Sequence, residues 1–169
     1  MKFRELGRIG IKVSEIGFGA WGIGGLSRNA PGYGEVDDNE SIKALRFAYE
    51  KGVTFYDTAD LYGDGHSERI IAEALGEMRD KIIIASKGGA LPHTGLYMPQ
   101  DFSAKHLTKA LDQSLRRLNT DYIDLYQLHS PKIEDFEKNE CIETLKRFKK
   151  TGKIREFGVS VRSPMDAKY

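Results

Sequence analysis

The 169-residue sequence has a single cysteine, Cys141, so no disulfide can form within the chain. It also lacks long hydrophobic runs, since its longest aliphatic run, residues 82–85, is far shorter than the roughly 20 residues that span a bilayer. Near the N-terminus, Glu5 places an acid where a signal peptide needs an apolar stretch. A lone cysteine fits a reducing compartment. We therefore expect a cytoplasmic protein without a membrane segment.

The chain has almost no excess charge of either sign. Lys and Arg total 26 and Asp and Glu total 25, which gives a net charge of +1. Without a basic excess, non-specific binding to nucleic acid or to an anionic membrane is not expected. Hydrophobic residues make up 40% of the sequence and charged residues 30%, a composition typical of a globular protein and too apolar for a disordered one.

Short apolar runs alternate with helical patterns along most of the chain. The predicted strands start 29 to 40 residues apart and cover residues 16–19, 53–57, 82–87, 122–129 and 157–161. This spacing accommodates one strand and one helix each time, and such alternation is typical of βα units in a parallel sheet. The prediction is one α/β domain over residues 1–169, with about five βα units.

The predicted helices have recognisable ends. They run from Ile42 to Gly52, from near Ser67 to near Gly76, from the N-cap Ser103 through Leu118, and from Ile142 to Gly152. A fifth helix is expected to open at Ser163 and Pro164. Before the first strand, residues 3–6 and 11–14 are predicted to form a small β-hairpin. Residues 22–37 are glycine-rich and aperiodic, which predicts a long loop of the kind that often carries function.

Polar side chains stand at the ends of three consecutive predicted strands. Asp57 ends the second strand, Lys87 the third and His129 the fourth. Each shares a face of its strand with the residues two and four positions earlier. In a barrel of parallel strands, the carboxyl ends converge on the face from which (β/α)8 enzymes draw their catalytic residues. Tyr62 follows Asp57 by five residues and is expected to lean over the same opening.

These four side chains suit the protonation of a carbonyl oxygen. A buried lysine needs a charged partner, and Asp57 is available to Lys87. A charged Lys87 beside the Tyr62 phenol favours the phenolate form and makes Tyr62 a proton donor. His129 can hydrogen-bond a substrate oxygen near Tyr62. Each residue alone has an ordinary structural explanation, as a solvated loop residue or a strand cap, so it is their shared position that favours a catalytic site.

At this point the sequence resembles a known family. The motifs that carry the resemblance are Ile16-Gly17-Phe18-Gly19-Ala20-Trp21, Asp57-Thr58-Ala59-Asp60-Leu61-Tyr62-Gly63 with His66-Ser67-Glu68, Ala85-Ser86-Lys87, Asp124-Leu125-Tyr126-Gln127-Leu128-His129 and Gly158-Val159-Ser160. In this order they are similar to the aldo-keto reductases over essentially the whole chain. The resemblance implies a (β/α)8 barrel of the TIM type and NADPH-dependent reduction of aldehydes and ketones.

The resemblance also implies roles for individual residues. Tyr62 is the implied proton donor, Lys87 and Asp57 the pair that tunes it, and His129 the group that orients the substrate. Hydride is implied to come from C4 of the nicotinamide of NADP(H). The implied cofactor-binding residues are Ala20, Trp21, Asp57 and Ser160. Trp21 is also implied to flank the substrate.

Two features depart from the family pattern. Val161 follows Ser160 where the family commonly has asparagine, and the chain ends at Tyr169 with five of eight strands, whereas a (β/α)8 chain typically has about 250 residues. We expect either one part of a longer protein or a short product that self-associates through its open edge strands. The inward residues expected to lose part of their cover are Val53, Phe55, Ile83, Ala85, Ile123 and Leu125.

Several functions remain open from the sequence. The leading hypothesis is a carbonyl reductase, and the alternatives are a non-catalytic relative that binds nucleotide or acts as a regulatory subunit, an inactive truncated form, and an interaction module that uses an exposed edge strand. Residues 17–22 spell G-x-G-x-x-G but lead into more glycines rather than a helix, so no Rossmann site is expected. No metal site is expected, because the four histidines lack ligand spacing.

Overall fold

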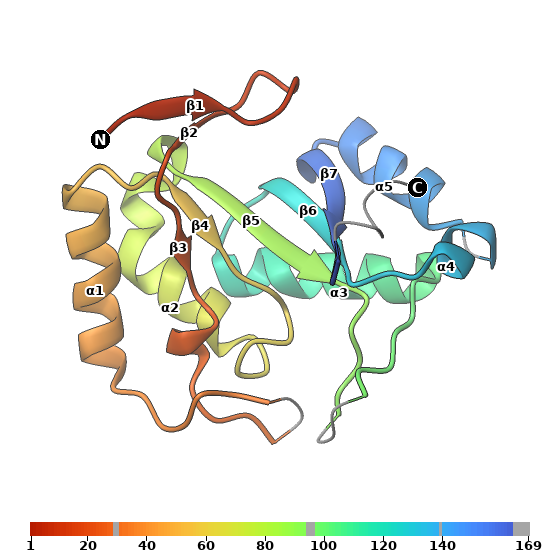
Figure 1. Ribbon diagram of the computed structural model, residues 1–169, viewed down its shortest axis with the longest axis horizontal. Coiled ribbons are helices and arrows are strands. Elements are labelled where there is room, and N and C mark those ends of the chain that lie inside the picture. The colour runs from red at the N-terminus through yellow and green to blue at the C-terminus, as the bar shows by residue number, and fades with distance from the viewer. Residues whose placement is uncertain (29–30, 94–96, 139, 164–169) are drawn as a thin grey trace.

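The computed structural model describes residues 1–28, 31–93, 97–138 and 140–163. At its centre lies a parallel sheet of five strands in the order β3-β4-β5-β6-β7 (Figure 1). The strands are β3 (Phe18–Gly19), β4 (Phe55–Asp57), β5 (Ile83–Gly88), β6 (Ile123–His129) and β7 (Ile154–Ser160). Their spatial order follows the chain order, as successive βα units of a barrel require. The predicted parallel sheet is confirmed, and β3 and β7 are its edges.

The predicted N-terminal hairpin is also present. Strands β1 (Phe3–Glu5) and β2 (Lys12–Ser14) pair antiparallel. The Ser14 amide donates to Thr54 Oγ1 at 3.1 Å, and the Thr54 amide donates to Ser14 Oγ at 2.9 Å. This reciprocal pair ties the hairpin to the chain just before β4, at the end of the strand opposite to Asp57.

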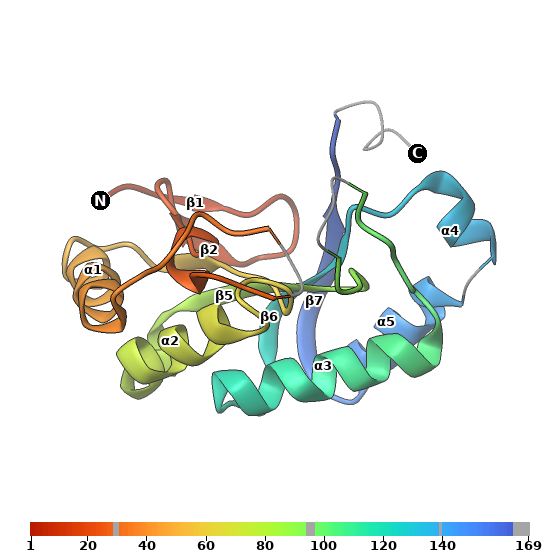
Figure 2. The same cartoon turned by 90° about the horizontal axis from the view of Figure 1, so that it is seen from below.

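Four longer helices lie along one face of the sheet (Figure 2). They are α1 (Asp38–Glu50), α2 (His66–Leu75), α3 (Ala104–Leu118) and α5 (Cys141–Lys150), and each packs against the next. The capping predicted at Ser103 is confirmed, because its hydroxyl accepts the amide hydrogen of His106. Among the described residues, no helix combines the length and apolar character that crossing a bilayer requires.

The core lies between the sheet and these helices. Side chains on the helix-facing side of the strands, such as Tyr56, Ile84 and Tyr126, are fully or almost fully buried. The expectation for the inward side is met only in part. Phe55, Ile83 and Leu125 are half-buried, whereas Val53, Ala85 and Ile123 are buried. Ala85 keeps its cover because it is small and lies between Asp57 and Leu125 in the sheet register.

Some element bounds differ from the sequence expectations. Strand β7 begins at Ile154, three residues before the predicted start at Phe157, because its charged residues Arg155 and Glu156 conceal the strand pattern. Three short helices were not predicted, and the first two are the 3-10 helix η1 (Gly22–Gly24) and α4 (Ile133–Lys138). A further 3-10 helix, η2 (Gly76–Lys81), follows α2. The helix expected to open at residues 163–164 extends outside the described residues.

A buried carboxylate fixes the amino ends of the central strands. Asp124 on β6 has no exposed side-chain surface and accepts the Ile84 amide of β5 at 3.0 Å. Its two oxygens also accept hydrogen bonds from Arg79 and Arg155, each at 2.8 Å. Both guanidinium groups lie over the Tyr122 ring, at 4.0 and 4.2 Å from its centroid. One acid thus joins η2, β5, β6 and β7.

Removing this carboxylate should destabilise the protein strongly. We expect Asp124→Ala to lower the free energy of unfolding by about 3–5 kcal/mol, because Arg79 would lose its charged partner in a mostly buried position. Urea denaturation followed by circular dichroism measures the change. Asp112→Ala is the matched control, because the Lys153–Asp112 pair is about 40% exposed on both sides and should cost at most about 1 kcal/mol. Equal losses in the two variants would contradict this account.

Candidate active site

The ammonium group of Lys87 is the centre of the candidate site. Lys87 lies near the carboxyl end of β5 and is 4% exposed. Its Nζ donates to Asp57 Oδ1 at 2.6 Å, to the Thr58 carbonyl oxygen at 2.8 Å and to the Tyr62 hydroxyl oxygen at 3.2 Å. These three acceptors saturate a buried cation that would otherwise be costly. The structure thus brings Asp57, Tyr62 and Lys87 together at one point.

The loop between β4 and α2 carries Tyr62 to this position. It first continues the pairing of β4 with β5, because the Thr58 amide donates to the Ala85 carbonyl at 2.8 Å and the Asp60 amide donates to the Lys87 carbonyl at 3.2 Å. It then passes against η1 so closely that a Cβ on Gly63 would collide with the carbonyl oxygen of Gly24. Two glycines are therefore needed for the contact that brings Tyr62 over the strand ends.

His129 completes the group at the last position of β6. Its ring stands edge-on to the Tyr62 ring, with the centroids 6.0 Å apart at 84°. Burial, helped by the positive charges of Lys87 and Arg162, lowers the pKa of His129 to about 4, so its imidazole is neutral near pH 7. Nδ1 is buried without a hydrogen-bond partner among the described residues. If the neutral ring carries its proton on Nε2, the buried Nδ1 has only a lone pair and no unsatisfied N–H, and Nε2 is a hydrogen-bond donor.

Gln100 holds the backbone of His129 in place, and no sequence pattern pointed to this residue. The Gln100 amide nitrogen donates to the His129 carbonyl at 2.8 Å and also to the Ser130 carbonyl. Ser130 adopts a left-handed backbone conformation, with φ at 57°, which is uncommon for a residue other than glycine. Gln100 itself is fixed by a β-bridge to Ala90 just after β5. Strands β5 and β6 are thus tied together beyond their ends by one side chain.

Aromatic and small residues shape the space beside Tyr62. A cavity of about 250 Å³ is lined by Trp21, Tyr62, His129 and Arg162, among others. The Trp21 ring stacks on Tyr62 with the centroids 5.9 Å apart at 24°. Ala20 lies beneath, fully buried, with its amide donating to Asp57 and its carbonyl accepting from Ser67. Trp21 therefore faces the cavity directly, whereas Ala20 supports it from below.

The neighbouring end of β7 offers an open surface. Ser160 lies opposite His129 in the register, and its carbonyl accepts the Ser130 amide hydrogen at 2.7 Å. Two residues earlier, a Cβ added to Gly158 would meet only Leu125, at 3.8 Å. The surface at Gly158, beside Gln127 in the sheet register, is therefore open. Among the described residues, no three His, Cys, Asp or Glu side chains are grouped so as to hold a metal ion.

A second layer of acids lies behind the site. Glu68 is fully buried and accepts from Ser86 Oγ and from Arg117 Nε, both at 2.6 Å. Asp60 Oδ1 is buried and, within the described part of the chain, has no hydrogen-bond partner. Burial, reinforced by the charge of Glu68, raises the pKa of Asp60 to about 8 despite the opposing charges of Arg117 and Lys87. Asp60 is therefore largely protonated at neutral pH.

The comparisons with known proteins agree with the motifs. The model of the aldo/keto reductase family matches residues 15–168. The chain is 38% identical over 163 residues to the aldo-keto reductase YhdN of Bacillus subtilis, and the match covers 95% of this chain and 47% of that protein. The chain thus spans about half the length of the curated relatives it matches.

Solved structures give the same picture of the fold. The holo form of the aldo-keto reductase AKR11C1 from Bacillus halodurans superposes with a TM-score of 0.85 and 36% identity, over 99% of this chain and 53% of that one. An aldo/keto reductase from Klebsiella pneumoniae in complex with NADP and acetate superposes with a TM-score of 0.75 and 30% identity, over 94% of this chain and 50% of that one. The five-stranded sheet therefore corresponds to part of the TIM barrel of such reductases.

The raised pKa of Asp60 predicts a specific dependence of stability on pH. The folded state keeps its proton up to about pH 8, whereas the unfolded chain loses it near pH 4. The contribution of Asp60 to stability is therefore present below about pH 4 and is lost as the pH rises toward 8. We expect Asp60→Asn to raise the free energy of unfolding more at pH 8 than at pH 5, in urea denaturation at both values.

The exposed Asp64 on the same loop supplies the control for this measurement. Asp64→Asn should leave the pH dependence of the wild-type protein unchanged. If Asp60→Asn also left it unchanged, the buried acid would not be protonated as the structure indicates.

Proposed function

Because the chain belongs to the aldo/keto reductase family of oxidoreductases, we propose that it reduces aldehydes and ketones to alcohols with NADPH. The observation that carries the proposal is the position of Lys87, whose Nζ lies 2.6 Å from Asp57 Oδ1 and 3.2 Å from the Tyr62 hydroxyl. This arrangement gives a phenol that can release a proton next to a cation that stabilises the resulting charge. This arrangement favours an enzyme that reduces a polar double bond over a protein that only binds nucleotide.

Tyr62 acts as the general acid in this proposal. As negative charge develops on the substrate carbonyl oxygen, the Tyr62 hydroxyl transfers its proton to that oxygen and becomes a phenolate. The Lys87 ammonium stabilises this phenolate, and its low exposure strengthens the interaction. Asp57 keeps Lys87 charged and directs its Nζ toward the hydroxyl. The product is an alcohol, and Tyr62 regains its proton from solvent.

His129 orients the substrate. Because its pKa is lowered to about 4, the ring is neutral and its Nε2 proton can be donated to the carbonyl oxygen near Tyr62. A neutral donor in this position leaves proton transfer to Tyr62. Trp21, stacked on Tyr62, closes the side of the cavity and limits access of water to the reacting oxygen.

The open inner face of β7 fits the nicotinamide end of NADP(H). When bound, this cofactor supplies the hydride that reaches the carbonyl carbon. The uncovered surface at Gly158 accommodates a flat ring, and Ser160 at the strand end offers a hydroxyl for its carboxamide. The NADP complex of the Klebsiella pneumoniae relative supports this choice of cofactor. Asp57, Trp21 and Ala20 are the other cofactor contacts that the resemblance implies.

Substitution of the phenol tests the proposed chemistry. We expect Tyr62→Phe to lower kcat for an aromatic aldehyde with NADPH by at least about 100-fold, because it removes the only proposed proton donor. The rate is measured by the loss of NADPH absorbance. Tyr33→Phe is the matched control: Tyr33 contacts Trp21 edge-on, 73% exposed, and its hydroxyl has no role in the proposal.

The same experiment separates catalysis from binding. Quenching of Trp21 fluorescence by NADPH should persist in Tyr62→Phe, because this change leaves the cofactor surface intact. A wild-type protein that shows the quenching but oxidises no NADPH with any aldehyde would instead be a non-catalytic nucleotide-binding relative.

The contacts of Gln100 predict a positioning effect. We expect Gln100→Ala to lower kcat by about 10-fold, because loss of both hydrogen bonds releases the strained turn at Ser130 and lets the His129 ring move. The affinity for NADPH, measured by fluorescence, should stay unchanged. Gln113→Ala on the exposed face of α3 is the control. A fall in thermal stability with no change in kcat would show that Gln100 is only structural.

A further inference from the structure

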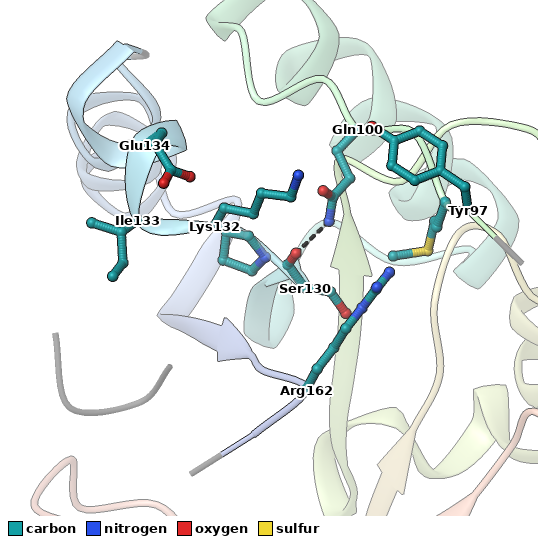
Figure 3. Close-up of a pocket in the computed structure, with 9 residues that line it drawn as sticks. Tyr97, Gln100, Ser130, Lys132, Ile133, Glu134 and Arg162 are labelled. Atoms are coloured by element: carbon teal, nitrogen blue, oxygen red, sulfur yellow. Dashed lines mark hydrogen bonds between the residues drawn. The ribbon is translucent and has the colours of Figure 1, made fainter. Parts of the chain in front are cut away.

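Two cavities adjoin at the carboxyl ends of β6 and β7. The first, of about 250 Å³, contains Tyr62 and His129. The second, of about 290 Å³, lies between the loop after β5 and the start of α4 (Figure 3). Met98, Ser130 and Arg162 line both. A molecule held at Tyr62 can therefore extend past Arg162 into the second cavity.

Two cationic side chains line the second cavity. Lys132 and Arg162 line it from separate chain segments, and the ammonium end of Lys132 points toward Gln100 (Figure 3). Within the described ranges, neither forms an ion pair. Glu134 also lines the cavity but is more than 4.0 Å from both charged groups.

The charge of Arg162 acts on the reactive end of the site as well. It is one of the groups that lower the pKa of His129, after burial and Lys87. Arg162 follows Ser160, the last residue of β7, by two residues, and it lines both cavities. An unpaired guanidinium at the wall between the two cavities attracts an anion to a defined point beside the proposed proton donor.

We propose that Arg162 and Lys132 form a subsite that selects carbonyl substrates carrying a carboxylate, an inference that rests on the proposed function. The carbonyl oxygen lies at Tyr62 and His129, and the carboxylate lies in the second cavity. A guanidinium offers two parallel N–H donors that match the two oxygens of a carboxylate, and Lys132 adds a second charge. The cavities together accommodate an aldehyde or ketone whose acid group is separated from the carbonyl by a spacer.

Matched pairs of aldehydes test this selectivity. The first pair is 4-carboxybenzaldehyde and its methyl ester, and the second is succinic semialdehyde and its methyl ester, so that two spacers are sampled. We expect the wild-type protein to prefer the acid in at least one pair. Arg162→Met should lower the ratio of kcat/KM for that acid to kcat/KM for its ester by about 10- to 100-fold, and Lys132→Met should lower this ratio by several-fold. Arg69→Met, on α2 and outside both cavities, should leave the ratio unchanged.

A binding measurement separates this inference from the proposed function. Calorimetric titration with 4-(hydroxymethyl)benzoate and with its methyl ester requires no turnover. Tighter binding of the acid to the wild-type protein, lost in Arg162→Met, supports the subsite even if no aldehyde is reduced. Equal treatment of acid and ester in both pairs and in the titration overturns it. The subsite is also overturned if the only defect of Arg162→Met is weaker NADPH binding, because Arg162 would then bind a phosphate of the cofactor.

Discussion

The buried ammonium group of Lys87 imposes the constraint on which the site depends. A charge with 4% exposure must be surrounded by acceptors, and the three that surround it come from a strand end, a backbone carbonyl and a loop phenol. Asp57 and Tyr62 are therefore not placed independently, since each is held by the need to satisfy the same cation. Lys87 Nζ contacts both Asp57 and Tyr62. The fold that buries this ammonium group therefore also builds the arrangement proposed for proton transfer.

The sheet register supplies the rest of that geometry. Lys87 lies beside Gln127, and His129 lies two residues further along β6, beside Ser160. The stagger brings the imidazole above the ammonium group rather than level with it, so that the Tyr62 ring fits edge-on against His129. At the other end of the same strands, Asp124 fixes this register through the Ile84 amide and two arginines. The stabilising contacts of Asp124 and the candidate active site thus lie at opposite ends of the strands, as is usual in barrels of this type.

Strand parity was enough to predict that Asp57, Lys87 and His129 share one face and one end of the sheet. It could not predict how the loop after β4 brings Tyr62 to them, because that depends on the close contact of Gly63 with Gly24 from a distant loop. Gln100 lies in an irregular segment without periodicity, and its function arises only from backbone carbonyls that it meets in the fold. Helix α4 is too short for an apolar stripe to reveal it. Sequence patterns locate residues on regular elements and in motifs, and they miss a residue such as Gln100 whose partners are backbone atoms met only in the fold.

The distribution of unsatisfied polar groups shows where function is concentrated. Around Asp124 the charged side chains find partners, which is the rule for buried polar groups. At the carboxyl ends of the strands the pattern reverses: the buried atoms without partners in the described structure include Asp60 Oδ1 and His129 Nδ1, and the exposed Arg162 has no ion pair. The polar groups at the amino ends of the strands have partners, so the polar groups without partners at the carboxyl ends need a separate explanation. In the proposed function, the proton that Nδ1 lacks is on Nε2 of His129, which donates to a carbonyl oxygen, and in the proposed subsite Arg162 binds an anion.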